Sequence, residues 1–148
     1  MGVEIERKFL VDTAKWEKVK PKSGIRIIQG YIIKTVEKTV RIRLFGDAGF
    51  ITVKGETKGF SRSEYEYAIP KVEAEKMLKE FCAEKVIKTR YEVDFDGFVW
   101  EVDVFKTPRK GLILAEIELS NEKEAFLHPE WLGKEVSDNP EYFNANMI

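Results

Sequence analysis

The chain has 148 residues, of which 43% are hydrophobic and 34% are charged, and its formal net charge is -1. This length corresponds to about one domain, and the composition excludes a disordered chain. The nearly balanced charge also argues against a nucleic-acid-binding surface or a polybasic membrane patch. No repeat, low-complexity tract or flexible linker interrupts the sequence, so residues 1–148 are expected to form a single domain.

The cysteine content and the N-terminus indicate the compartment. Cys82 is the only cysteine, which excludes an internal disulfide and favours a reducing environment. Residues 1–8 are charged where a signal peptide needs an apolar run, and no apolar stretch approaches the roughly 20 residues of a membrane span. We therefore expect a cytoplasmic protein that does not associate with membranes.

Eight strand-like runs dominate the chain, and short turns join several of them. The runs cover residues 2–11, 25–34, 38–46, 49–55, 61–69, 85–95, 98–106 and 111–120. Gly46-Asp47-Ala48-Gly49 separates the third run from the fourth, and Asp96-Gly97 between the sixth and seventh is typical of a tight type I′ hairpin turn. Joints this short indicate that neighbouring strands are antiparallel.

Helices are expected in three places. A short one follows the first strand over residues 12–19, with Asp12 or Thr13 as its N-cap. The clearest follows Pro70 and covers residues 71–82, where apolar side chains recur at helical spacing and Cys82 falls on the buried face. From Asn121 onward the tail is expected to form short helical pieces broken at Pro129 and Pro140.

Strong charges occupy one face of seven of the eight strand-like runs, at the i, i+2 spacing that places side chains on the same side of a strand. In chain order these residues are Glu4, Glu6, Lys8, Arg41, Arg43, Lys54, Arg62, Glu64, Glu66, Lys88, Arg90, Glu101, Asp103, Glu116 and Glu118. On a single strand such a row usually faces solvent. Repeated over seven strands, and so rich in arginine and paired carboxylates, it favours an enclosed charged interior instead.

These patterns predict an α+β fold built on a closed eight-stranded antiparallel β-barrel, with a charged tunnel inside and helices packed outside. About eight strands close a barrel wide enough to hold one small ligand. The aromatic residues Trp16, Trp100, Trp131 and Tyr142 are expected to serve packing. The role of Tyr31, on the strand after Gln29-Gly30, stays open.

The interior charges indicate what the tunnel binds. Seven cationic and eight acidic side chains give the empty tunnel a net charge of -1, which one divalent cation would raise to +1 and two to +3. This predicts an anion site that a metal switches on, and the planar forks of arginine suit phosphate oxygens. The pairs Glu4/Glu6 and Glu116/Glu118 offer oxygen-only ligation suited to Mg²⁺ or Mn²⁺.

Histidine chemistry is excluded by the same inventory. His128 is the single histidine and lies in the tail, outside the predicted strands. This position argues against a histidine-based zinc site and against a Ser-His-Asp or Cys-His nucleophile system.

The opening segment Glu4-Ile5-Glu6-Arg7-Lys8, followed by Phe9-Leu10-Val11, resembles the ExExK signature of the CYTH superfamily, the triphosphate tunnel metalloenzymes. The resemblance continues in order over essentially the whole chain. It includes Gln29-Gly30-Tyr31, Arg41-Ile42-Arg43, Ile51-Thr52-Val53-Lys54, Arg62-Ser63-Glu64-Tyr65-Glu66, Lys88-Thr89-Arg90-Tyr91, Trp100-Glu101-Val102-Asp103-Val104, Ala115-Glu116-Ile117-Glu118-Leu119 and Trp131-Leu132-Gly133-Lys134-Glu135-Val136.

The resemblance implies roles for the charged residues. Glu4 and Glu6 would bind the catalytic metal with help from Glu116 and Glu118. The phosphates would be held by Lys8, Arg41, Arg43, Lys54, Arg62, Lys88 and Arg90. Supporting roles would fall to Glu64, Glu66, Glu101 and Asp103, the first two orienting cations, although a metal role for Glu64 and Glu66 is also open. The segment Pro140–Asn146 resembles a terminal helix that lies across one tunnel mouth.

Short bacterial proteins of this kind resemble inorganic triphosphatases, so the expected activity is metal-dependent hydrolysis of tripolyphosphate to pyrophosphate and phosphate. Lys8 or Lys88 could act as a base only if neighbouring cations depress its pKa, and a purely electrostatic role is the preferred interpretation. Alternatives are a thiamine triphosphatase or a class IV adenylate cyclase. An alternative of another class is a non-catalytic module that binds polyphosphate or a nucleotide, although paired acidic residues would serve no purpose there. The resemblance is also compatible with a homodimer.

Overall fold

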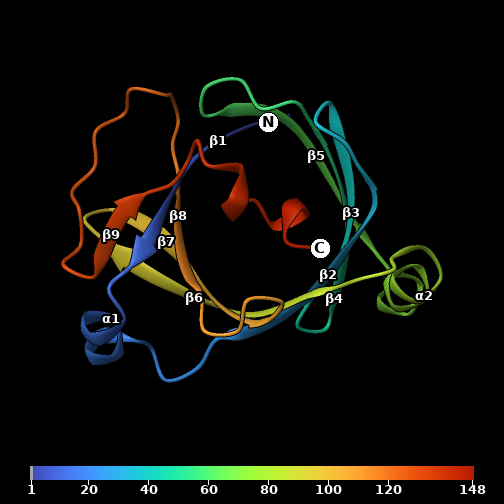
Figure 1. The fold of residues 1–148 in the computed structure, drawn as a ribbon, viewed down its shortest axis with the longest axis horizontal. Coiled ribbons are helices and arrows are strands. Elements are labelled where there is room, and N and C mark those ends of the chain that lie inside the picture. Colours follow the sequence, from blue (N-terminus) through green and yellow to red (C-terminus); the bar gives the residue numbers. More distant parts are fainter. Residues whose placement is uncertain (1) are drawn as a thin grey trace.

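The computed structural model describes residues 2–148, and its central feature is a closed antiparallel β-barrel. The ring of strands is visible end-on in Figure 1. Eight strands form it: β1 (Val3–Val11), β2 (Ile25–Lys34), β3 (Lys38–Phe45), β4 (Ala48–Gly55), β5 (Ser61–Ile69), β6 (Val86–Phe95), β7 (Phe98–Thr107) and β8 (Ile113–Glu118). They follow the order β5-β4-β3-β2-β6-β7-β8-β1, and β1 closes the ring by pairing Val3–Ile5 with Ser61–Ser63 of β5. The predicted α+β class and eight-stranded closure are confirmed.

Turn residues set the register of the hairpins. Asp96 and Gly97 both have positive φ angles, 51° and 80°, as a type I′ turn requires, and they join the paired residues Phe95 and Phe98. Gly46, with φ 58°, opens the turn between β3 and β4. Both turns lie where the sequence predicted them.

The tail differs from the prediction. Residues 122–131 form no helix, and Leu132–Glu135 forms a ninth strand, β9, which pairs with the C-terminal half of β1. This run of four residues is too short to show a strand period, and its place is fixed by β1, whose edge lies free beyond the β5 pairing. Helical pieces appear only after Pro140, as the 3₁₀ helices η1 (Pro140–Tyr142) and η2 (Asn144–Asn146).

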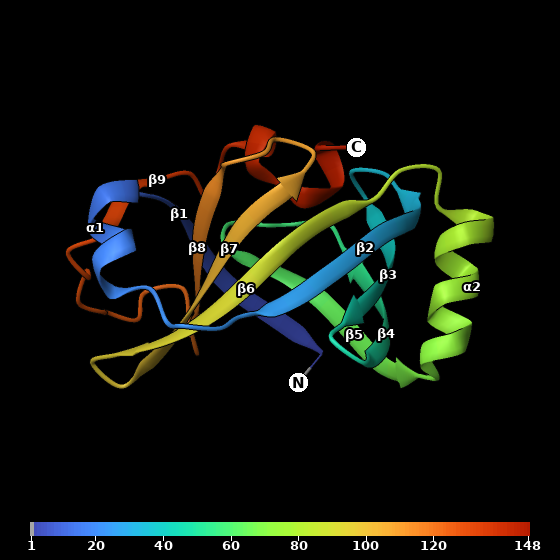
Figure 2. The same ribbon diagram turned by 90° about the horizontal axis from the view of Figure 1, so that it is seen from below.

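Two α-helices pack outside the barrel (Figure 2). α1 (Thr13–Val19) begins after Asp12, whose carboxylate accepts a hydrogen bond from the Lys15 backbone N–H at 3.0 Å. α2 (Lys71–Phe81) begins after Pro70 and ends at Phe81, one residue earlier than predicted, with Cys82 as its C-cap. No helix within residues 2–148 has the length and apolar character needed to cross a bilayer.

The apolar faces of the strands point outward and are covered unevenly. Beneath α2, Ile42, Ala74, Leu78 and Cys82 form one buried cluster. A larger cluster beneath α1 and the tail is held by edge-to-face aromatic contacts, and it contains Trp16, Trp100, Trp131, Phe9 and Phe126. The packing roles expected for the three tryptophans are therefore confirmed. On β5 the outward Tyr65 and Tyr67 remain 51% and 61% exposed, so the expected cover is incomplete.

Gly30 on β2 lies in close contact with the residues that follow the end of α2. A Cβ atom there would lie 2.7 Å from Cys82 Cβ and 3.2 Å from the Glu84 carbonyl oxygen. Gly30→Ala should therefore lower the free energy of unfolding by about 1–3 kcal/mol, because the end of α2 must move away from β2. Urea denaturation measures the change. Gly55→Ala is the matched control, since its Cβ meets Ser63 at an ordinary 3.5 Å; equal effects of both substitutions would contradict the close-packing argument.

Candidate functional site

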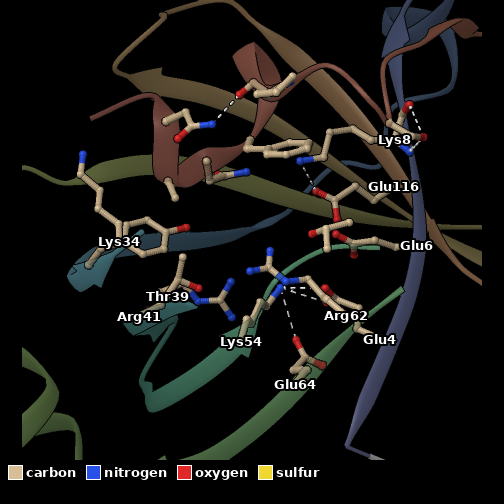
Figure 3. Close-up of a pocket in the computed structure, with 18 of the residues that line it drawn as sticks. Glu4, Glu6, Lys8, Lys34, Thr39, Arg41, Lys54, Arg62, Glu64 and Glu116 are labelled. Carbon is tan, nitrogen blue, oxygen red and sulfur yellow. Dashed lines mark hydrogen bonds and ion pairs between the residues drawn. The ribbon is translucent and has the colours of Figure 1, made fainter. Parts of the chain in front are cut away.

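The barrel encloses a cavity of about 650 Å³ lined by the charged rows. In Figure 3 the side chains of β1 and β8 point into it from one wall, and those of β3 and β4 from the facing wall. Every predicted interior charge lines the cavity except Asp103, which lies behind Lys88 and Arg90: the lining includes Glu4, Glu6, Lys8, Arg41, Arg43, Lys54, Arg62, Glu64, Glu66, Lys88, Arg90, Glu101, Glu116 and Glu118. The strand alternation thus brings the predicted residues together.

Carboxylates from β1 and β8 gather at one end of the cavity. Pairing of β1 with β8 places Glu6 opposite Glu118 and Lys8 opposite Glu116. Burial, followed by the neighbouring carboxylates Glu116 and Glu4, raises the pKa of Glu6 well above its usual value. Negative charge is therefore in excess around Glu6.

The neighbouring Glu116 behaves oppositely although it is equally enclosed. Burial alone would raise its pKa, but the Lys8 ammonium, a hydrogen bond from Glu6 and the Arg90 charge hold the pKa of Glu116 well below its usual value. The pair therefore favours one proton on Glu6 and a charge on Glu116. Glu118 lies at the edge of the cavity and is exposed to solvent. Partial desolvation of its carboxylate, followed by the nearby charge of Glu4, raises its pKa.

Lysines hold two of these carboxylates. Lys54 Nζ lies 3.0 Å from both carboxylate oxygens of Glu4 and 3.4 Å from Glu64, while Lys8 Nζ lies 3.6 Å from Glu116. With Glu4 and Glu116 facing lysines, no three acidic, histidine or cysteine side chains of residues 2–148 yet converge as metal ligands. The donor set nevertheless fits a hard divalent cation, because it is all oxygen and Glu6 forms no ion pair with a cationic side chain of residues 2–148.

Arginines from β3 form the facing wall. Arg41 contacts Glu66 at 3.4 Å and Thr52 at 3.1 Å, yet its buried Nε has no hydrogen-bond partner within residues 2–148. Burial and the charges of Arg41 and Arg90 lower the pKa of Arg43 to about 9. An unsatisfied buried donor among crowded cations favours binding of an anion here, because the anion would supply both the acceptor and the counter-charge.

Asp103 anchors a third group of charges on β6 and β7. Its carboxylate accepts both arms of the Arg90 fork at 2.8 and 2.9 Å and contacts Lys88 Nζ at 2.6 Å. Burial opposes ionisation, but Lys88 and Arg90 lower the pKa of Asp103 to about 2. Burial also lowers the pKa of Lys88 to about 7, with Arg90 and Arg43 adding to the effect against the attraction of Asp103.

Two neutral residues complete the site, and the sequence analysis did not identify them. Gln29 Oε1 accepts a hydrogen bond from Arg43 Nε at 2.8 Å, and Gln29 Nε2 donates to Asn144 Oδ1 at 3.3 Å. Asn144 Oδ1 also accepts from Lys88 Nζ at 2.9 Å. Neither residue is charged, so neither belongs to the charge pattern that identified the other site residues. Gln29 is found only from its position opposite Arg43 in the β2–β3 pairing, and Asn144 only from the folded position of the tail.

The C-terminal segment lies against the cavity. η1 and η2 sit within the outline of the ring in Figure 1, and Phe143, Asn144 and Asn146 line the cavity. Lys8 Nζ donates to the Tyr142 carbonyl oxygen at 3.1 Å. The expected position across a barrel mouth is therefore found, with 3₁₀ turns in place of a regular helix.

The remaining lining residues refine the prediction. Arg62 donates through Nε and Nη2 to the carbonyl oxygen of Gly55, the last residue of β4, at 3.0 and 2.8 Å, and these bonds hold its side chain against that strand. Tyr31 does reach the cavity, and Lys34 adds a cation that the pattern analysis did not include. Glu101 contacts Arg90 at 3.1 Å, consistent with a supporting position. His128 stacks on Phe126 and does not line the cavity.

Comparison with known proteins identifies similar sequences over the full length. The CYTH domain family model matches residues 2–145. The inorganic triphosphatase of Acetivibrio thermocellus is 46% identical over 149 residues, covering 100% of this chain and 94% of that protein. The inorganic triphosphatase of Nitrosomonas europaea is 36% identical, covering 95% of this chain and 93% of that protein.

Solved structures share the fold. The crystal structure of an inorganic triphosphatase superposes with a TM-score of 0.66 at 34% identity, covering 97% of this chain and 96% of that one. A Pyrococcus horikoshii protein superposes with a TM-score of 0.57 at 20% identity, over 80% of each chain. At that lower identity the second likeness concerns the fold alone.

Asp103 offers a test of the buried charges. Asp103→Asn leaves Lys88 and Arg90 without their shared counter-charge, so we expect a loss of about 3–5 kcal/mol in the free energy of unfolding at pH 7. The folded-state pKa of Asp103, about 2, lies below its usual value near 3.9, so its stabilisation is complete above about pH 4 and is lost as the pH falls toward 2.

Urea denaturation between pH 7 and pH 3 therefore should show the gap between wild type and Asp103→Asn narrowing at the acid end. The matched control is Asp94→Asn at the exposed C-terminal end of β6, which should change stability by no more than about 0.5 kcal/mol. A gap that stays constant across this pH range would contradict the assigned ion pairs.

Proposed function

The chain belongs to the CYTH domain family, and on that premise we propose that it is a metal-dependent inorganic triphosphatase, which hydrolyses tripolyphosphate to pyrophosphate and phosphate. The 46% identity to a triphosphatase over the full chain supports this activity. One observation carries the proposal: a single enclosed cavity joins an acidic end, where clustered carboxylates raise the pKa of Glu6, to a basic wall where Arg41 Nε has no acceptor within residues 2–148.

Glu4, Glu6, Glu116 and Glu118 are the residues that would hold a metal, with Mg²⁺ or Mn²⁺ as the preferred ions. When bound, such an ion supplies Lewis-acid stabilisation of phosphate oxygens and favours ionisation of a nearby water. The raised pKa of Glu6 supports this assignment, because nearby positive charge would restore the ionised carboxylate.

The cationic side chains would hold the phosphates, and two of them would change partners to do so. Lys54 contacts Glu4 and Lys8 contacts Glu116 in the structure. Phosphate oxygens compete for the same ammonium groups, and each lysine that turns to a phosphate releases a carboxylate for the metal. The remaining phosphate contacts would come from Arg41, Arg43, Arg62, Lys88 and Arg90.

Catalysis would then depend chiefly on electrostatics. Phosphoryl transfer passes through a loose transition state, in which positioning of the reactants and neutralisation of the leaving group matter more than proton removal. Arg43, Lys88 and Arg90 are held in place before the reaction by Gln29, Asn144 and Asp103, so these three cations need little reorganisation as charge develops.

Lys88 is the strongest candidate for a proton acceptor, since its pKa of about 7 leaves part of its population neutral near neutral pH. A bound triphosphate would raise that pKa again through its negative charge. We therefore assign Lys88, like Lys8, a role as a cation that contacts the reacting phosphates.

Substrate choice is tested by presenting tripolyphosphate, ATP and thiamine triphosphate in turn to the purified protein with Mg²⁺ or Mn²⁺. We expect tripolyphosphate to give pyrophosphate and phosphate, with turnover abolished by excess EDTA, because the acidic end needs its metal. Ion chromatography and a cyclic AMP assay identify the products. Pyrophosphate with cyclic AMP from ATP would favour a cyclase, faster hydrolysis of thiamine triphosphate would favour that substrate, and tight binding without turnover would indicate a binding module.

Glu6→Gln separates catalysis from folding. Removing a metal-binding carboxylate should lower kcat by about 10²-fold or more. Stability should be unchanged or higher above pH 5, because the raised pKa of Glu6 means that its ionisation opposes folding as the pH increases. Steady-state assays and thermal unfolding on the same preparation check both effects. Full activity in Glu6→Gln would remove Glu6 from the metal site.

Arg41→Ala should instead raise KM for the triphosphate at retained stability.

A further inference from the structure

Arg7 lies between Glu6 and Lys8 on β1, but its side chain points to the outside of the barrel. Its Nε and Nη2 donate to the two carboxylate oxygens of Glu135 on β9, at 2.8 and 2.6 Å. Arg7 and Glu135 are 24% and 29% exposed, so the bidentate pair is partly shielded from water and salt. A fork held in this way fixes both the position and the rotation of the Arg7 side chain.

The Glu135 end of this pair connects back to the peptide units of Lys8. Ser137 Oγ donates to Glu135 at 2.6 Å and accepts from the Lys8 backbone N–H at 2.8 Å. The Val136 N–H donates to the Lys8 carbonyl oxygen at 2.8 Å. The strand segment that presents Lys8 to the cavity is therefore clamped from outside by Arg7 and the residues around Glu135.

The same guanidinium also supports a wall of the cavity. Arg7 Cζ lies 5.0 Å from the centroid of the Phe60 ring and 5.1 Å from that of Phe126, within the range of cation–π contacts. Phe60 belongs to the β4–β5 connection, residues 56–60, which lines the cavity. Its carbonyl oxygen accepts from the Glu6 backbone N–H at 3.2 Å, and its own N–H donates to Glu122 at 3.0 Å.

We propose that Arg7 is a positioning residue for the triphosphatase site: from outside the barrel it holds β1, which carries Glu6 and Lys8, in register with the 56–60 wall. This rests on the proposed function. It does not require Arg7 to touch substrate or metal. The Arg7 side chain contacts Glu135 of β9, Phe60 of the wall segment and Phe126 together, so its loss loosens all three against β1.

The test compares Arg7→Met, which keeps much of the apolar stem but loses the fork, with Arg26→Met, a matched control at an exposed arginine on β2. Assays run well below both melting temperatures. We expect Arg7→Met to lower kcat/KM for tripolyphosphate by about tenfold or more, in the range found for residues that orient metal ligands, and Arg26→Met to be neutral. Arg7→Lys should also be impaired, since an ammonium cannot reproduce the fork.

A double-mutant cycle distinguishes positioning from a general loss of stability. If Arg7 acts through the wall, Arg7→Met combined with Phe60→Leu should be about as impaired as Arg7→Met alone. Fully additive losses would contradict this route, and wild-type kcat/KM in Arg7→Met or Arg7→Lys would overturn the proposal. If Arg7→Met does not fold, Arg7→Lys and Phe60→Leu carry the same comparison.

Hydrogen exchange tests the positioning role of Arg7 independently of the triphosphatase activity, because it needs no substrate. The amides of residues 57–62 should exchange faster in the Arg7 variants than in wild type or Arg26→Met, whatever the substrate of the protein. An inactive wild type with this change in exchange would refute the triphosphatase and leave the clamp standing. Unchanged exchange together with an active wild type would refute the clamp alone.

Discussion

A charge enclosed in a barrel needs a partner, because removing an ion from water costs several kcal/mol unless another charge or a set of hydrogen bonds compensates it. This protein encloses many such charges and meets the constraint by interleaving the signs: Lys54 with Glu4, Lys8 with Glu116, and Lys88 and Arg90 with Asp103. In the proposed function, the Lys54–Glu4 and Lys8–Glu116 pairs separate on binding: the lysines then contact the triphosphate and the glutamates contact the metal. The internal ion pairs thus stabilise the barrel while keeping its charged side chains in place.

The outside of the barrel makes this interior possible. Apolar side chains that fill the core of an ordinary sheet protein here face α1, α2 and the tail, with Trp16 and Trp100 fully buried among them. β1 connects the two environments, since Glu6 and Lys8 face the cavity while Arg7 and Phe9 face the outer packing. Interactions on the outer face of the barrel can therefore affect how the side chains of β1 are presented to the cavity.

The sequence predicted the barrel well because strand alternation is a strong local signal. Residues two apart, such as Arg41 and Arg43, must lie on the same face of a strand. Of the charged residues predicted to face the interior, all but Asp103 line the cavity. The prediction of short helical pieces in the tail was wrong for the residues of β9. Four residues are too few to show the alternation of a strand, and β9 pairs with β1, which is far away in the sequence. Gln29 and Asn144 carry no charge, so their place between Arg43 and Lys88 depends on tertiary contacts. The Glu135 partner of Arg7 is likewise 128 residues away in the chain.

In the proposed function, carboxylates and cations of one cavity bind a metal ion and a triphosphate together. The most direct measurement is a crystal structure with Mn²⁺ and a slowly hydrolysed triphosphate analogue, with the metal located by its anomalous signal. We expect the Mn²⁺ peak about 2 Å from carboxylate oxygens of Glu6 and Glu116, with Lys8 and Lys54 turned from their glutamates onto phosphate oxygens. A metal bound outside the barrel, or phosphates bound while Lys54 still holds Glu4, would contradict it.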